Sequence, residues 1–189
     1  MLCDSLFGSK SEINALMALM CFHVSRFNAR IGTNGELLTL EEQDRRLWNR
    51  ELIERGSYYF QKAYVDDVSD TMTEYHIQAA MAGLHCQAKD YASTDWIQLL
   101  KLYDVQMETN PSPVVELNRL VVLAKAKGVD EAIDKLKRIE NQSIFSNYYL
   151  FYAIKGDLLA QKGKMDEAIV SILKAIDLTK TFQKRNIYS

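Results

Sequence analysis

The sequence predicts an all-α protein in which helical hairpins stack against one another into a superhelical array. Residues that interrupt helices are scarce, because the chain of 189 residues contains 8 glycines and 2 prolines. Apolar residues make up 48% of the chain, which is enough to bury a sizeable core. A four-residue string also recurs in the C-terminal half, at a spacing that suits a helix–turn–helix unit. Together these observations favour long packed helices over many short strands.

The recurring string is the clearest pattern in the sequence. Asp130-Glu131-Ala132-Ile133 is repeated 36 residues later as Asp166-Glu167-Ala168-Ile169, and a glycine precedes each copy. The flanking residues recur as well, since Leu123 corresponds to Leu159. A period near 34 residues is typical of tetratricopeptide (TPR) repeats, which are helix pairs. We therefore expect TPR-like repeats over residues 71–189.

Small residues mark the positions where the paired helices must approach closely. In the second copy these positions hold Gly156, Ala168 and Ala175, which suit interaxial distances of about 8–10 Å. The first copy matches less well and keeps only Ala132, because Leu120 and Ile139 stand at the other two positions.

The N-terminal part, residues 1–70, is expected to be a separate helical segment that packs with the repeats as one body. Residues 11–27 form a helix that is apolar nearly all round, and we expect it to be buried. The Asn34-Gly35 pair predicts a tight turn within a short irregular or β-like excursion near 31–40. Asn49 is a good N-cap for a helix over 50–65.

The remaining helices follow from caps and periodicity. Ser112 and Pro113 predict a helix start, with the helix running to about Lys127. Its partner covers about 130–140, and the second pair covers about 145–162 and 165–180. Upstream, helices over 74–87 and 96–107 could form a divergent first repeat.

Composition excludes several classes of function. The net charge is −2, from 23 Lys+Arg and 25 Asp+Glu, so we expect no direct DNA binding. The cysteines, Cys3, Cys21 and Cys86, lack a CxxC spacing, which is typical of a reduced cytoplasmic protein. The apolar run in the first helix is too short to cross a bilayer, so no membrane contact is expected.

No pattern in the sequence indicates catalysis. His76 and His85 are nine residues apart, which is not the spacing of a metal-binding pair on one helix, and His23 lies among apolar residues. Nucleophile-elbow and phosphate-loop patterns are missing. We therefore expect no enzymatic activity, no metal and no cofactor.

One polar cluster follows the Asn-Gly turn and contains Asp44, Arg45 and Trp48. As a surface, it could bind a partner, because Arg and Trp are common hot-spot residues. Alternatively, Asp44 or Arg45 forms a buried ion pair with Arg26 or another group, and Trp48 fills the junction between the first helix and the rest. We favour the structural alternative.

A second set of polar residues lies in the helix that Ser112 starts. Asn118 and Arg119 interrupt its apolar face, so they either line the concave groove of the array or bond to a neighbouring helix. Both alternatives stay open. Lys125 lies on a face that could also line the groove.

Several strings together resemble a known family over about residues 11–180. They are Ala15-Leu16-Met17-Ala18-Leu19-Met20 with His23 and Arg26; Gln43-Asp44-Arg45 with Trp48; Tyr75-His76-Ile77-Gln78-Ala79-Ala80 with His85; Asp95-Trp96; Leu102-Tyr103-Asp104; and Pro111-Ser112-Pro113 with Leu117-Asn118-Arg119. In order and spacing they are similar to the C-terminal extension of bacterial extracytoplasmic-function (ECF) RNA polymerase sigma factors that carry a TPR-like tail.

This resemblance implies a regulatory role in transcription initiation. The promoter- and core-binding sigma domains are not visible, so we expect the chain to be the tail alone, as a fragment or a shortened product. Implied partners are the sigma N-terminal domains, the RNA polymerase core or another regulatory protein. The alternative is a free-standing TPR adaptor that binds a peptide or protein in its groove.

Overall fold

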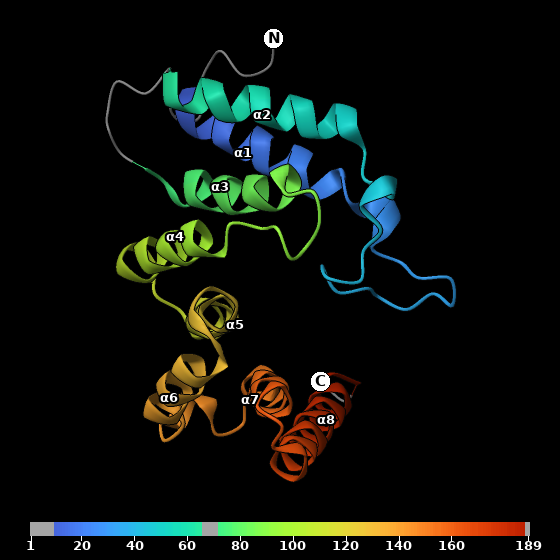
Figure 1. The fold of residues 1–189 in the computed structure, drawn as a ribbon, viewed down its shortest axis with the longest axis vertical. Coiled ribbons are helices and arrows are strands. Elements are labelled where there is room, and N and C mark those ends of the chain that lie inside the picture. Colours follow the sequence, from blue (N-terminus) through green and yellow to red (C-terminus); the bar gives the residue numbers. More distant parts are fainter. Residues whose placement is uncertain (1–9, 66–71, 188–189) are drawn as a thin grey trace. The chain divides into compact units, whose positions relative to one another are not determined.

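A computed structural model describes residues 10–65 and 72–187. Over these residues the chain is built from α-helices and short 3-10 turns, with one isolated β-bridge and no strand. The all-α prediction is therefore confirmed. The chain divides into two compact units, residues 1–95 and 96–189, each of which is a set of packed helices (Figure 1). Cys3 lies outside the described residues.

The first unit contains three helices, α1 (Lys10–Val24), α2 (Arg50–Val65) and α3 (Glu74–Gln87). Helix α1 packs against both α2 and α3 (Figure 1). Its buried face carries mainly small residues and one large ring, whereas Met20 and Val24 remain exposed. Small side chains such as Ala15 and Ala18 let the neighbouring helices approach closely.

Phe22 occupies the centre of this first unit. Its ring is buried and faces glycines on both neighbouring helices, Gly56 on α2 and Gly83 on α3. A Cβ atom at Gly56 would lie 2.6 Å from the ring, and one at Gly83 would lie 3.3 Å from it. The two glycines therefore provide the space in which the ring fits.

The segment between α1 and α2 contains the expected turn. The 3-10 turn η1 (Phe27–Ala29) follows α1, so the helix ends before the predicted residue 27. Ile31 and Leu37 then form an antiparallel β-bridge, and Gly35 adopts a φ of 83° in the turn between them. The predicted β-like excursion is thus confirmed. A second 3-10 turn, η2 (Arg45–Leu47), leads into α2.

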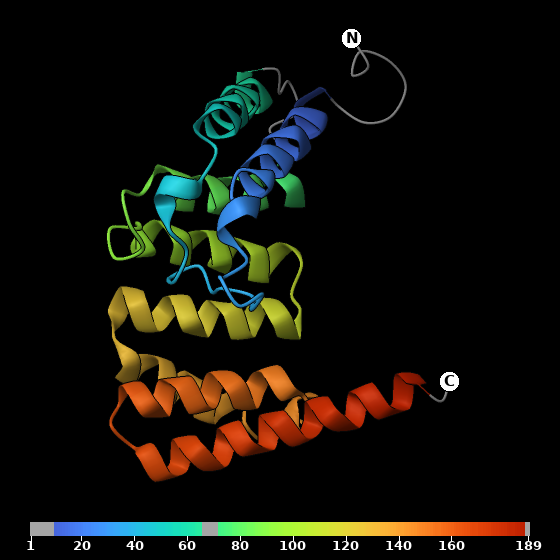
Figure 2. The same ribbon diagram turned by 90° about the vertical axis from the view of Figure 1, so that its right-hand side faces the viewer.

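The second unit is a succession of five helices, each packed against the next. They are α4 (Trp96–Thr109), α5 (Pro113–Lys127), α6 (Val129–Ile139), α7 (Tyr149–Gln161) and α8 (Met165–Ile187), with the turn η3 (Ser143–Phe145) before α7. Ser112 caps α5 through its hydroxyl group, which accepts a hydrogen bond from the Val115 N–H at 3.3 Å. Figure 2 shows α7 and α8 side by side, with the longer α8 running past the end of α7.

The repeat predicted from the sequence corresponds to the pairs α5–α6 and α7–α8. Gly128 and Gly163, which precede the two copies of the string, have φ values of 106° and 81° and turn the chain between the paired helices. Ala132, Ala168 and Ala175 are buried as expected. A Cβ atom at Gly156 would lie 2.6 Å from Ile172, so the close approach of α7 and α8 requires this glycine.

Two further helix boundaries differ from the sequence prediction: α7 begins later than expected, and α8 runs to Ile187 rather than to about 180. Helix α7 begins at Tyr149 rather than near 145, because η3 turns the chain so that the buried Phe145 ring stacks on Phe151 with centroids 5.3 Å apart. Helix α3, which the sequence pattern places with the repeats, packs against α1 and α2 in the first unit. Its pairing with α4 as a divergent first repeat, and the boundary at 70/71, stay predictions.

Replacing Gly56 with alanine should destabilise the protein although alanine favours helices. The new methyl group would overlap the Phe22 ring, at a cost of about 1–3 kcal/mol in the free energy of unfolding after the gain in helix propensity. Gly83→Ala is the matched control: it faces the same ring at the longer distance and should change stability by less than about 1 kcal/mol. Urea unfolding followed by circular dichroism measures both; equal effects would contradict the packing described.

Candidate functional site

The predicted cluster around Trp48 belongs to the core of the first unit. Trp48 is 4% exposed and shares a cluster with Leu19, Phe22 and Cys86. The guanidinium carbon of Arg45 lies 4.0 Å from the centroid of the indole ring, and that of Arg26 lies 5.5 Å from it. Trp48 therefore fills the junction between the first helix and its neighbours, and two arginines cover its ring.

Arg45 also closes the end of α3. Its Nη1 group donates hydrogen bonds to the backbone carbonyl of His85 and, at 3.5 Å, to that of Ala88. A cation is favourable at this helix terminus, where the carbonyl groups lack partners within the helix. Within the described structure, Nη2 of Arg45 and Nε1 of Trp48 are buried without a hydrogen-bond partner.

Asp44 does not form the buried ion pair that the sequence suggested. Its carboxylate accepts a hydrogen bond from the backbone N–H of Arg46 at 2.9 Å and pairs with the Arg46 guanidinium at 2.8 Å. The Arg46 side chain is 90% exposed, so this is a surface contact that caps η2. The hydrogen bonds of Arg45 go to backbone carbonyls instead. A role of Arg26, Asp44, Arg45 and Trp48 in partner binding stays a prediction.

The positive charge of this cluster affects the neighbouring side chains. Burial, together with the charges of Arg26 and Arg45, lowers the pKa of His85 to about 4, so its imidazole is neutral near pH 7. Burial raises the pKa of the Cys86 thiol, although Ser25 and nearby arginines act in the opposite direction. A protonated, buried thiol is a poor nucleophile, so Cys86 has the character of a core residue.

A serine–histidine pair lies in the first unit, but its geometry is structural. Ser11 and His76 are each 1% exposed, and the Ser11 hydroxyl group donates to the Ala63 carbonyl at 2.7 Å. Nε2 of His76, 2.8 Å from Ser11 Oγ, must then donate, while Nδ1 accepts from the Thr73 N–H at 3.3 Å. This tautomer cannot take a proton from Ser11. The network joins α1, α2 and the start of α3.

In the second unit, the three candidate binding residues of α5 have different surroundings. Arg119 forms an ion pair with Asp104 of α4, with Nε and Oδ1 2.6 Å apart, so for this residue the contact with a neighbouring helix is confirmed. Asn118 is half-buried and Lys125 is exposed. Their contribution to a binding groove stays a prediction.

A charged cleft of about 400 Å³ lies between α6, α7 and the start of α8, and the sequence analysis missed it. Its charged lining residues are Asp130, Asp134 and Lys137 of α6, Glu140 directly after it, Lys155 of α7, and Lys162, Lys164 and Glu167 beyond α7. Four acidic and four basic side chains thus share the cleft. Of these residues, the sequence analysis singled out only Asp130 and Glu167, which belong to the two copies of the repeated string. The four lysines follow no repeat and gave no signal.

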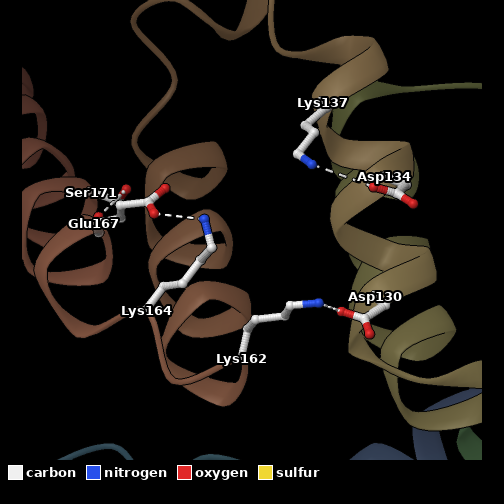
Figure 3. A network of polar contacts seen from close by, with 7 residues as sticks. All are labelled: Asp130, Asp134, Lys137, Lys162, Lys164, Glu167 and Ser171. Carbon is white, nitrogen blue, oxygen red and sulfur yellow. Dashed lines mark hydrogen bonds and ion pairs between the residues drawn. The ribbon is translucent and has the colours of Figure 1, made fainter.

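The charges of this cleft are paired. Figure 3 shows Lys162 reaching from the end of α7 to Asp130 of α6, and Lys155 pairs with Glu140 across the same two helices. Lys164 pairs with Glu167 at 2.7 Å and Lys137 with Asp134 at 3.4 Å. The pair of Lys155 and Glu140 is half-buried, whereas the other three pairs are exposed. Exposed pairs contribute little to stability and exchange readily for charges on a partner. The cleft can therefore receive a polypeptide segment that carries both signs of charge.

Neither a metal site nor a membrane span is found in the part of the chain that the structure describes. No group of three or more His, Cys, Asp or Glu side chains there could hold a metal ion. No helix among the described residues is both long and apolar enough to cross a bilayer.

The helix pairs define a protein of stacked helical repeats, and comparison with known families agrees. Residues 58–188 match the family described as tetratricopeptide repeat-like domain, and the chain belongs to this family. Residues 1–64 match a family of unknown function (DUF6596). The match to the family of unknown function covers α1, η1, η2 and most of α2.

Among curated proteins, the chain is similar to an uncharacterized protein of Rhizobium meliloti (strain 1021). The two are 36% identical over 173 residues, which is 92% of this chain and 40% of the relative. The chain thus spans less than half the length of that relative. No solved structure matches the chain significantly.

Replacing Arg45 with alanine should lower the free energy of unfolding by about 1–3 kcal/mol, because it removes both the stacking on Trp48 and the hydrogen bond to the end of α3. Arg46→Ala, one residue away, removes only an exposed ion pair and should cost much less. Thermal unfolding monitored by circular dichroism compares the two variants; a larger loss for Arg46→Ala would contradict this arrangement.

Stability should fall as the pH is lowered from about 6.5 to about 4. The pKa of His85 is lower in the folded chain than the ordinary 6.5, so protons bind preferentially to the unfolded chain in this window. The loss attributable to His85 is on the order of 2–3 kcal/mol, and His85→Gln should flatten this part of the profile.

Urea unfolding at several pH values measures this effect. His23→Gln serves as a control, because the His23 side chain is less buried than that of His85, so burial, Arg26 and Arg30 lower the pKa of His23 to a smaller extent. A pH profile that is unchanged by His85→Gln would show that another group is responsible.

Proposed function

We propose that this chain is a non-enzymatic regulatory and protein-interaction domain of an ECF-type RNA polymerase sigma factor and acts in the cytoplasm. The TPR-like fold supports a role in protein contacts, because stacked helix pairs expose extended surfaces for partners. In the relative from Rhizobium meliloti the matched region makes up 40% of the protein, so there it is part of a longer chain.

The observation that carries the sigma-factor proposal is the convergence of the strings that resemble that family. Arg26, Trp48 and the end of α3 come from three different strings, and they meet in one cluster of the first unit. Residues from separate segments that pack into one cluster are expected to occur together in the members of a family. The resemblance therefore concerns a folded domain rather than isolated short matches.

The charged cleft of the second unit is the surface we propose for partner contacts. Its ion pairs orient the lysine and carboxylate side chains, and a partner segment of complementary charge can take the place of either member of a pair. The cleft is balanced in charge, which favours a polypeptide over a nucleic acid. The proposed partners are the promoter- and core-binding domains of the sigma factor, which are called sigma regions two and four, or the polymerase core.

A free-standing TPR adaptor is the alternative. The cleft of about 400 Å³ supports it equally, because a short peptide would also fit there. The two proposals differ in the partner, so binding measurements separate them.

The chain should bind a polypeptide that contains sigma regions two and four, or sigma-free core RNA polymerase, in isothermal titration calorimetry at two salt concentrations. Lys137→Glu reverses a charge of the cleft and should weaken binding by about tenfold, with less effect at high salt. Lys135→Glu makes the same change two residues away, at an exposed position outside the cleft lining, and should leave the affinity unchanged.

Absence of binding to both probes would contradict the sigma-factor proposal and would favour the adaptor. Equal loss of affinity in Lys135→Glu and Lys137→Glu would instead mean that the partner responds to overall charge and not to the cleft. The variants Asn118→Ala and Lys125→Ala test in the same titration whether α5 also contributes to binding, because a weaker affinity is expected if these side chains contact the partner.

A further inference from the structure

Helix α8 carries an apolar stripe that is largely exposed within the described structure, although Ile172 at its edge also packs over Gly156 of α7. The stripe consists of Met165, Ile169, Ile172, Leu173 and Ile176, whose side chains are 38–60% exposed. Their spacing places them on one face of the helix over three turns. A different face of α8, which carries Ala168, Ser171 and Ala175, is buried. The helix is therefore apolar on two sides but buried on only one.

Two positions of this stripe are more apolar than their counterparts in the internal repeat. At the offset of 36, Leu173 and Ile176 of α8 correspond to Lys137 of α6 and to Glu140 directly after it. Helix α6 is covered by α7, and these two charged residues face the cleft there, where Glu140 pairs with Lys155. The positions that are charged on the covered helix are thus apolar on the uncovered one.

A shallow groove runs along the stripe. It has a volume of about 390 Å³, and small residues of α7, Gly156 and Ala160, form one wall. Met165, Ile169 and Leu173 line the opposite side. Small residues at this wall allow a second helix to approach closely, as Gly156 already does for Ile172 of the same chain.

We propose that the occupant of this groove is α8 of a second copy of the chain, which runs antiparallel to the first in a two-fold dimer. The residues 169, 172, 173 and 176 are spaced symmetrically about their midpoint. An antiparallel copy therefore places Ile169 against Ile176 and Ile172 against Leu173, and the same contacts occur twice, as a two-fold interface requires.

The charges at the ends of the stripe fit the same arrangement. Asp166 is exposed at the start of α8, and Lys180 is exposed fourteen residues later. An antiparallel pairing brings Asp166 of one copy near Lys180 of the second copy, and the reverse contact forms at the other end. A parallel pairing would bring like charges together. The groove lies on the other side of α7 from the lining of the charged cleft, so this proposal does not depend on the proposed function.

Sedimentation equilibrium of the full chain, from about 1 to about 200 µM, tests the proposal. We expect a monomer–dimer equilibrium. Leu173→Lys, at an exposed position that folding does not require to be buried, should raise the dissociation constant of the dimer by about tenfold or more. Ile144→Lys is the control, because Ile144 is equally exposed in the same unit but lies outside the stripe.

Charge reversal at the two ends distinguishes the antiparallel pairing from other dimers. Asp166→Lys and Lys180→Asp should each weaken the dimer, and the double variant should restore it. Circular dichroism checks that each variant keeps its helices. A monomer at every concentration overturns the proposal and leaves the groove to another protein. A dimer that is insensitive to Leu173→Lys, or charge reversals that do not compensate, overturns it as well.

Discussion

Close approach of helices at glycine is the constraint on which both units depend. In the first unit the Phe22 ring occupies space that side chains at Gly56 and Gly83 would fill, so α1 packs against two helices through one ring. In the second unit Ile172 of α8 occupies the corresponding space over Gly156 of α7. In each case a large side chain on one helix enters the surface of the next. The register of the helices is therefore fixed by a few residues rather than by a broad apolar face.

The polar residues of the two units have different roles. In the first unit the polar groups serve the packing: Arg45 closes α3, and His76 joins the ends of three helices. In the second unit the charged residues of α6 and α7 lie in an open cleft, and the apolar residues of α8 lie on an open face. The unusual residues of the first unit thus contribute to its folding, whereas those of the second unit are exposed to solvent.

The sequence predicted those features that depend on neighbouring residues. The Ser112 cap, the Asn-Gly turn and the small residues of the second repeat are local signals, and the structure confirms each of them. The contact between Arg45 and α3 joins residues forty positions apart, and nothing in the local pattern specifies which carbonyl group an arginine reaches. The partner of Asp44 was missed for the opposite reason, since the competing Arg46 is only two residues away. The charged cleft arises only when α6 and α7 are packed, so single helices do not reveal it.

We propose that the helices of the second unit form a partner-binding surface, whereas the first unit is a tightly packed helical body. Amide hydrogen exchange of the whole chain, alone and mixed with core RNA polymerase or a polypeptide of sigma regions two and four, tests it most directly. We expect slow exchange around Phe22 in α1, α2 and α3 under both conditions, and slower exchange in α6 and α7 only when the partner is present. Unchanged exchange in α6 and α7 with both partners, or partner-dependent protection confined to the first unit, would contradict it.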